Sequence, residues 1–196
     1  MIIKLEDDWD KALEKAVEVL NKGQVIIYPT DTVYGIGADA TNIEAVKKVY
    51  KIKERDITKP LLVLVSGLRM LLDYFEPNGR EILEIQRHFP GPYAFILKTR
   101  KKMLFGEKEI GVRVPNHYFC RKVSEELGKP IITTSANISG KKAPSSIEKI
   151  ENKIKERVDL IIDGGISKHK YASTVVNIRE KKIIRKGAGD YSFNYD

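Results

Sequence analysis

The chain has 196 residues and a formal net charge of +8, and its hydrophobic content of 42% is enough for a packed core. The one cysteine, Cys120, excludes an intramolecular disulfide, and the three widely spaced histidines lack the spacing of a zinc site. The positive charge favours a polyanionic partner such as ATP, pyrophosphate or RNA, although a lysine-rich surface adapted to heat has the same composition.

Helices and strands are predicted to alternate along the chain. Asp7 or Asp8 caps a first helix that ends near Gly23, and Thr41 or Asn42 begins a second. Further helices are predicted over residues 67–75, 79–88, 117–128 and 146–157. Strands are predicted over residues 24–28, 61–65, 93–97, 110–114, from 131 onward, and over 159–163, 174–178 and 182–185. The alternation indicates an α/β fold, and the closely spaced late strands favour a mixed sheet.

The sequence shows no internal repeat and no interdomain linker, so we expect a single domain over residues 1–196. No apolar run reaches the length of a membrane span, and the first residues lack the pattern of a signal peptide. We therefore expect a cytoplasmic protein without membrane contact.

Residues 28–37 read Tyr-Pro-Thr-Asp-Thr-Val-Tyr-Gly-Ile-Gly and follow an apolar strand. Pro29 ends that strand, and the next three residues can present two hydroxyls and a carboxylate beyond the sheet. Gly35 and Gly37 allow the backbone to turn tightly or to approach a ligand closely. A polar turn alone accounts for such a segment, so its companions along the chain decide its meaning.

Cations occur at several other predicted element ends. Lys53, Arg55 and Lys59 gather at the end of the second helix, where they suit either the helix dipole or a phosphate ligand. Arg113 interrupts an apolar strand, so it faces solvent or, if buried, needs a carboxylate or phosphate partner. Arg185 is placed in the same way after two isoleucines.

Residues 133–140 leave a strand and carry three hydroxyls and an amide between Thr133 and Asn137, followed by Ser139. No histidine lies nearby in sequence to act as a base, which disfavours a nucleophilic serine. The block suits either recognition of phosphate or ribose, or a simple cluster of turns and caps. The chain contains no P-loop, complete dinucleotide fingerprint or kinase signature.

Together these segments, with the Ser-Thr-Val-Val run at 173–176, resemble the YrdC family, whose members make threonylcarbamoyl-AMP for tRNA modification. The resemblance runs from the first helix to Arg185. It implies a twisted mixed sheet with flanking helices around a large positively charged cavity. It also implies a nucleotidyltransferase that converts L-threonine, bicarbonate and ATP, the last with Mg²⁺, to threonylcarbamoyl-AMP and pyrophosphate. A separate transferase then modifies the tRNA adenosine next to the anticodon.

Site residues are implied by motif position. The catalytic residues would be Lys53 and Arg55, and ATP would be held by Arg55, Lys59, Ser135, Asn137 and Arg185. L-Threonine would be held by Thr32, Tyr34, Arg113, Thr133 and Ser173. No residue is implied as a metal ligand. Leu64 stands where some relatives place a histidine near threonine, so that contact is not expected here.

Two other functions remain open from the residues. The first is a basic RNA-binding module of the same fold, which the charge of +8 permits and which would contact tRNA, rRNA or double-stranded RNA directly. The second is an enzyme that forms a carbamoyl-adenylate from carbamoyl phosphate, like the related domain of hydrogenase-maturation proteins.

Overall fold

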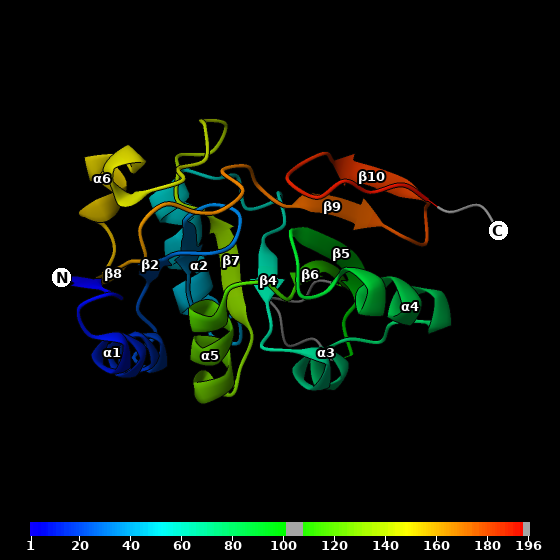
Figure 1. Cartoon of the computed structure of the whole chain (residues 1–196), viewed down its shortest axis with the longest axis horizontal. Coiled ribbons are helices and arrows are strands. Elements are labelled where there is room, and N and C mark those ends of the chain that lie inside the picture. The colour runs from blue at the N-terminus through cyan, green and yellow to red at the C-terminus, as the bar shows by residue number, and fades with distance from the viewer. Residues whose placement is uncertain (101–107, 194–196) are drawn as a thin grey trace.

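The computed structural model describes residues 1–100 and 108–193 (Figure 1). Within these residues ten strands form a sheet in the order β1-β8-β2-β3-β7-β4-β6-β5-β9-β10. The strands are β1 (Ile2–Lys4), β2 (Ile26–Tyr28), β3 (Gly35–Gly37), β4 (Leu62–Leu64), β5 (Tyr93–Lys98), β6 (Glu109–Arg113), β7 (Ile131–Ser135), β8 (Leu160–Asp163), β9 (Thr174–Asn177) and β10 (Lys182–Arg185). Parallel and antiparallel pairs occur together, which confirms the predicted mixed α/β sheet.

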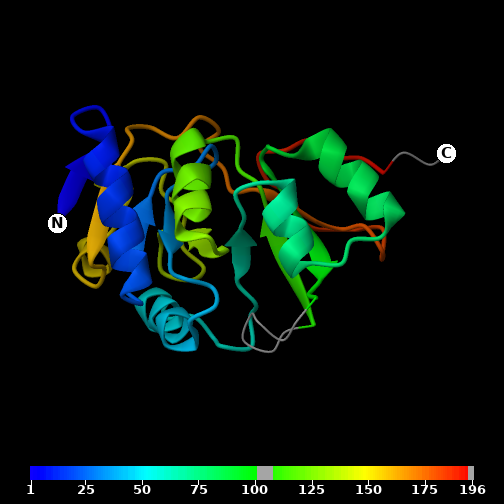
Figure 2. The same ribbon diagram turned by 90° about the horizontal axis from the view of Figure 1, so that it is seen from below.

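The helices are α1 (Trp9–Asn21), α2 (Ile43–Lys53), α3 (Leu68–Tyr74), α4 (Gly79–His88), α5 (Tyr118–Leu127) and the single turn α6 (Asn152–Lys155). The helices α1, α5 and α3 lie below the sheet in Figure 1 and in front of it in Figure 2. No helix among residues 1–100 and 108–193 is long and apolar enough to cross a membrane.

Two of the predicted helix starts are confirmed by their capping bonds. The Asp8 side chain accepts a hydrogen bond from the backbone N–H of Lys11, and Asn42 accepts from the N–H groups of Glu44 and Ala45. Gly23 follows α1 with φ of +66°, as expected for a residue just past a helix end. Local sequence therefore determines where these helices begin and end.

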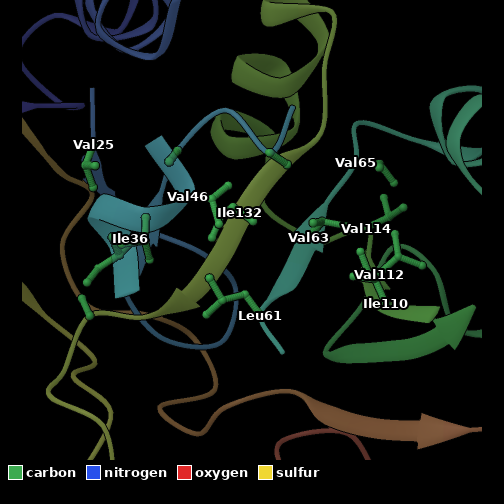
Figure 3. Packing of buried hydrophobic residues seen from close by; sticks show 14 of the residues in the cluster. Val25, Ile36, Val46, Leu61, Val63, Val65, Ile110, Val112, Val114 and Ile132 are labelled. Carbon is green, nitrogen blue, oxygen red and sulfur yellow. The ribbon is translucent and has the colours of Figure 1, made fainter. Parts of the chain in front are cut away.

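Two apolar clusters lie on opposite sides of the central strands. Alternate residues of β2 show the division, because Ile27 belongs to one cluster while Ile26 and Tyr28 belong to the other. The larger cluster joins α2 to the middle of the sheet, where Val63 and Ile132 lie close together (Figure 3). This packing fixes the strands whose ends carry the polar motifs.

The observed local structure differs from the predictions at two places. Strand β1 was not predicted, and only its middle residue is buried, whereas all three residues of β2 are buried. The helix predicted over 146–157 is wrong: a 3₁₀ turn (Ile147–Lys149) and α6 are separated by Ile150, which is extended at φ −82° and ψ 128°. Ile147, Ile150 and Ile154 are buried and keep helical spacing even though the backbone does not.

Gly35 and Gly37 lie in strand β3 rather than in a tight turn. A Cβ on Gly37 would stand 2.6 Å from the Tyr28 ring, so the glycine is needed for close approach between neighbouring strands. Residues 29–34 therefore form the loop of a hairpin, and β3 pairs on its other side with β7. This pairing places Gly35 opposite Ser135 and brings two of the sequence motifs together.

Candidate active site

A cavity of about 290 Å³ lies where several strands end, and the predicted motifs converge on it. Residues from the β2–β3 hairpin, the end of α2, the start of β4, and the ends of β6, β7 and β10 line it, together with the segment before β9. Nine of the eleven site residues implied by the sequence line this cavity, namely Thr32, Lys53, Arg55, Arg113, Thr133, Ser135, Asn137, Ser173 and Arg185.

The sheet pairing explains this convergence. Strand β7 pairs with β3 and with β4, and β4 pairs in turn with β6. The hydroxyl block at the end of β7 therefore lies between the β2–β3 hairpin and Arg113 of β6. Residues more than 80 positions apart are thereby brought to one edge of the sheet.

Arg113 is buried at 4% exposure and is held by the β2–β3 hairpin. Its Nη2 forms an ion pair with Asp31 Oδ1 at 2.5 Å, and its Nη1 donates to Thr32 Oγ1 at 2.9 Å. The Nε atom is buried without a hydrogen-bond partner. The prediction that a buried Arg113 needs an anionic partner is confirmed, and Nη1 and Nη2 each keep a second N–H bond.

The ammonium group of Lys53 holds the polypeptide that follows β7. It donates to the carbonyl oxygen of Ser135, to the carbonyl oxygen of Asn137 at 2.8 Å and to Asn137 Oδ1 at 3.4 Å. Burial, and secondarily the charge of Arg55, lower the pKa of Lys53 to about 7. The three oxygen acceptors favour the charged form of Lys53. Burial and the nearby charge of Arg55 favour the neutral form, so the two effects oppose each other.

Two further arginines line the cavity and are held by backbone carbonyl groups. Arg55 donates from Nε to the Lys59 carbonyl and from Nη2 to the Pro60 carbonyl, which fixes the turn before β4. Arg185 donates twice to the carbonyl of Ser173. Burial lowers the pKa of Arg185, and the charges of Arg113 and Arg55 lower it further.

The lining is strongly unbalanced in charge. Its cationic side chains are Lys53, Arg55, Arg113, Lys141 and Arg185, and no carboxylate occurs among the residues that line it. Hydroxyl groups of Thr30, Thr32, Thr133, Thr134, Ser135, Ser139 and Ser173 and the amide of Asn137 supply the neutral polar groups. Such a surface is suited to a ligand that carries several negative charges.

Two residues implied by the sequence lie outside this lining. The Tyr34 hydroxyl donates to the Gly165 carbonyl at 2.7 Å and accepts from the Gly164 N–H at 2.9 Å, so it anchors the turn after β8. Lys59 is exposed, and its carbonyl rather than its side chain serves the site. Leu64 packs fully buried in the cluster with α1 and α5, away from the lining.

Asp31 is the main residue that the sequence reasoning missed as part of the site. It was recognised as a carboxylate beyond a strand, but not as the partner of Arg113. The sequence carried a weak signal for this pair, because a buried arginine inside an apolar strand requires an anion and Asp31 is the carboxylate of the polar motif at residues 28–37.

The donor set does not fit a resident Mg²⁺ ion. Within residues 1–100 and 108–193 no group of three or more His, Cys, Asp or Glu side chains is placed to hold a metal, and the cavity offers only hydroxyl, amide and carbonyl oxygens. Mg²⁺ ordinarily takes carboxylates or substrate phosphates as its anionic ligands.

Comparison with known proteins identifies relatives of the whole arrangement. A model of the Sua5, YciO and YrdC family, described as telomere recombination, matches residues 18–187. A putative threonylcarbamoyl-AMP synthase of Methanocaldococcus jannaschii is 36% identical over 189 residues, covering 93% of this chain and 90% of the relative.

Solved structures with the same fold include P. abyssi Sua5 in complex with L-threonine, at a TM-score of 0.86 and 29% identity over 95% of this chain. This chain spans 57% of that protein. The crystal structure of E. coli YciO gives a TM-score of 0.82 at 29% identity and covers 92% of this chain and 91% of that protein.

Proposed function

The chain belongs to the Sua5, YciO and YrdC family, and on this basis we propose that it is an ATP-dependent threonylcarbamoyl-AMP synthase. L-Threonine, bicarbonate and ATP would give threonylcarbamoyl-AMP and pyrophosphate. The observation that carries this proposal is a cavity with five cationic side chains and no carboxylate, bordered by threonine and serine hydroxyls. A relative named as such a synthase and a threonine complex of a structural neighbour support it.

The reaction needs charge to be neutralised at two points. The deprotonated threonine amine attacks CO₂ derived from bicarbonate, which forms a carbamate anion. A carbamate oxygen then attacks the α-phosphorus of ATP, a new O–P bond forms, and the bond to the β-phosphate oxygen breaks to release pyrophosphate. Fixed cations stabilise the negative charge that develops at phosphorus and on the leaving group.

The threonine end of the cavity is assigned to the β2–β3 hairpin and to Arg113. A guanidinium that is already held at both Nη atoms can meet a carboxylate without losing further side-chain entropy. Thr32, Thr133 and Ser173 lie in the same lining and offer neutral polar groups to the amine and hydroxyl of threonine. This assignment retains the roles implied by the sequence, except that Tyr34 supports the wall from outside the lining.

The phosphate end is assigned to Arg55, Arg185 and the segment after β7 that carries Ser135 and Asn137. Lys53 receives a different role from the one implied by motif position alone. Its ammonium group is used by three protein acceptors, so it shapes this segment in addition to contributing charge. The lining supplies no carboxylate for Mg²⁺, so we assign the ion to the MgATP substrate and not to the protein.

The product is a mixed anhydride that water hydrolyses readily. A transferase must therefore use it before hydrolysis, which agrees with onward transfer of the threonylcarbamoyl group to a tRNA adenosine. Direct RNA contact by this chain is not needed for the reaction. Two HypF structures match at 19% and 18% identity, which shows the common fold alone.

The test is pyrophosphate release from MgATP, with L-threonine and bicarbonate each present or omitted. Release that requires both substrates is the expected result. Release that depends on carbamoyl phosphate and ignores threonine would contradict the proposal. Absence of turnover in a folded protein that binds RNA with a steep salt dependence would indicate the RNA-binding function instead.

A further inference from the structure

Asp31 is a buried carboxylate behind the cavity that the proposed reaction does not use. Its side chain is 2% exposed overall and does not line the cavity, whereas Thr30 and Thr32 on either side do. Burying a carboxylate is unfavourable unless its charge and hydrogen-bonding capacity are satisfied. The contacts of Asp31 therefore show which groups satisfy its charge and its hydrogen-bonding capacity.

Both carboxylate oxygens of Asp31 are engaged. Oδ1 pairs with Nη2 of Arg113 at 2.5 Å, and Oδ2 accepts from the backbone N–H of Asn116 at 3.1 Å. The Asp31 carbonyl also accepts from the His169 N–H at 3.0 Å. The carboxylate is thus fixed by the hairpin that carries it and by the segment after β6, so it cannot follow Arg113 if that side chain moves.

Thr32 provides the second anchor of the guanidinium. Its Oγ1 accepts from Nη1 of Arg113 at 2.9 Å, because a guanidinium can only donate. Thr30 Oγ1 donates to the Val33 carbonyl at 2.7 Å and lies 2.9 Å from Thr32 Oγ1, so the two hydroxyls belong to one hydrogen-bonded turn. The hairpin presents two acceptors, one charged and one neutral, to the two ends of one guanidinium.

We propose that Asp31 is a positioning residue that holds Arg113 in the orientation that receives the carboxylate of the amino-acid substrate. A guanidinium fixed at both Nη atoms cannot rotate about its long axis. One N–H bond on each Nη is used by the hairpin, and the second N–H bonds remain for a ligand in the cavity that Arg113 lines. Asp31 does not touch the substrate. The proposal rests on the proposed function, in which Arg113 binds threonine.

An electrostatic role and a positioning role of Asp31 predict opposite changes in threonine affinity when its carboxylate is removed. If Asp31 acted only through its charge, Asp31→Asn would make the cavity more positive and would strengthen binding of an anionic carboxylate. If Asp31 acts by holding Arg113, the same substitution frees the guanidinium and weakens threonine binding. The sign of the change in threonine affinity therefore distinguishes the two roles.

The test measures L-threonine binding by calorimetry without ATP, and KM values for threonine and for ATP in pyrophosphate release. For Asp31→Asn we expect the threonine dissociation constant and KM to rise roughly tenfold or more, the loss of one charge-assisted contact. We expect the ATP KM to stay within about twofold, because Asp31 contacts only the threonine end. Unchanged or tighter threonine binding would overturn the positioning role.

The matched control is Asp39→Asn. Asp39 is also a buried carboxylate, 3% exposed and paired with Lys129 at 2.7 Å, but it does not line the cavity or contact Arg113. It should lower stability without changing the threonine KM. An equal rise in threonine KM in both variants would show a general loss of structure and would also overturn the proposal.

A second variant covers the case in which Asp31→Asn does not fold. Asp31→Glu keeps the charge but displaces the carboxylate relative to Nη2 of Arg113, and unchanged threonine affinity there would refute the positioning mechanism. Threonine binding by the wild type distinguishes failure of this inference from failure of the proposed function. A wild type that binds no threonine refutes the function, whereas equal binding by wild type and Asp31→Asn refutes only the role of Asp31.

Discussion

Replacement of Lys53 by methionine tests whether this residue shapes the phosphate end of the cavity. Lys53→Met keeps most of the buried stem and removes the ammonium group, which leaves the Asn137 carbonyl without its donor and takes one of two donors from the Ser135 carbonyl. A buried polar group left unpaired costs about 1–3 kcal/mol. Relief of the desolvated ammonium, whose pKa burial lowers to about 7, offsets part of this loss. We expect the free energy of unfolding to fall by about 1–3 kcal/mol.

Lys53→Met should also slow turnover. The segment that carries Ser135 and Asn137 loses its anchor and the phosphate end loses one cation, which together should slow pyrophosphate release about a hundredfold. Denaturant unfolding gives the stability, and saturating substrates give the rate. The control Lys48→Met removes a lysine of the same helix that donates to the Gly23 carbonyl away from the cavity. It should retain full turnover. Wild-type turnover in Lys53→Met would refute the reasoning.

Three further predictions concern protonation, the cavity wall and the metal. Burial lowers the pKa of Lys53 to about 7, so binding of the polyanionic ATP at pH 8 should raise that pKa and take up a fraction of a proton. Calorimetry in two buffers of different ionisation enthalpy measures the uptake, which should vanish in Lys53→Met. Tyr34→Phe should lower the free energy of unfolding by about 1–2 kcal/mol, because the Gly164 and Gly165 backbone groups lose their hydrogen-bond partner. A large rise in the threonine KM of this variant would contradict the placement of Tyr34 outside the lining. Excess EDTA should abolish pyrophosphate release and added Mg²⁺ should restore it, while turnover that resists EDTA would refute the need for MgATP.

The sequence predicted those features that depend on neighbouring residues. The caps at Asp8 and Asn42 follow from residues within one helical turn, and the strands follow from short apolar runs. The requirement that a buried Arg113 have an anionic partner also follows from its surroundings in sequence. The family resemblance then supplied the fold and nine of the residues that line the cavity.

What the sequence did not predict depends on tertiary contacts. Asp31 and Arg113 are 82 positions apart and meet only because β7 and β4 join their strands. The cage around Lys53 is built from backbone carbonyls, which no residue pattern reveals. Likewise, the exposure of the Lys59 side chain and the break at Ile150 depend on how the chain turns, and not on residue type.

The most direct test of the central claim is the mass of the adenylate formed from ATP, L-threonine and ¹³C-labelled bicarbonate. Incorporation of one bicarbonate carbon should give threonylcarbamoyl-AMP one mass unit heavier than the product from unlabelled bicarbonate. A threonine-dependent adduct of AMP without the isotope shift, or no adduct from a folded protein, would contradict the account.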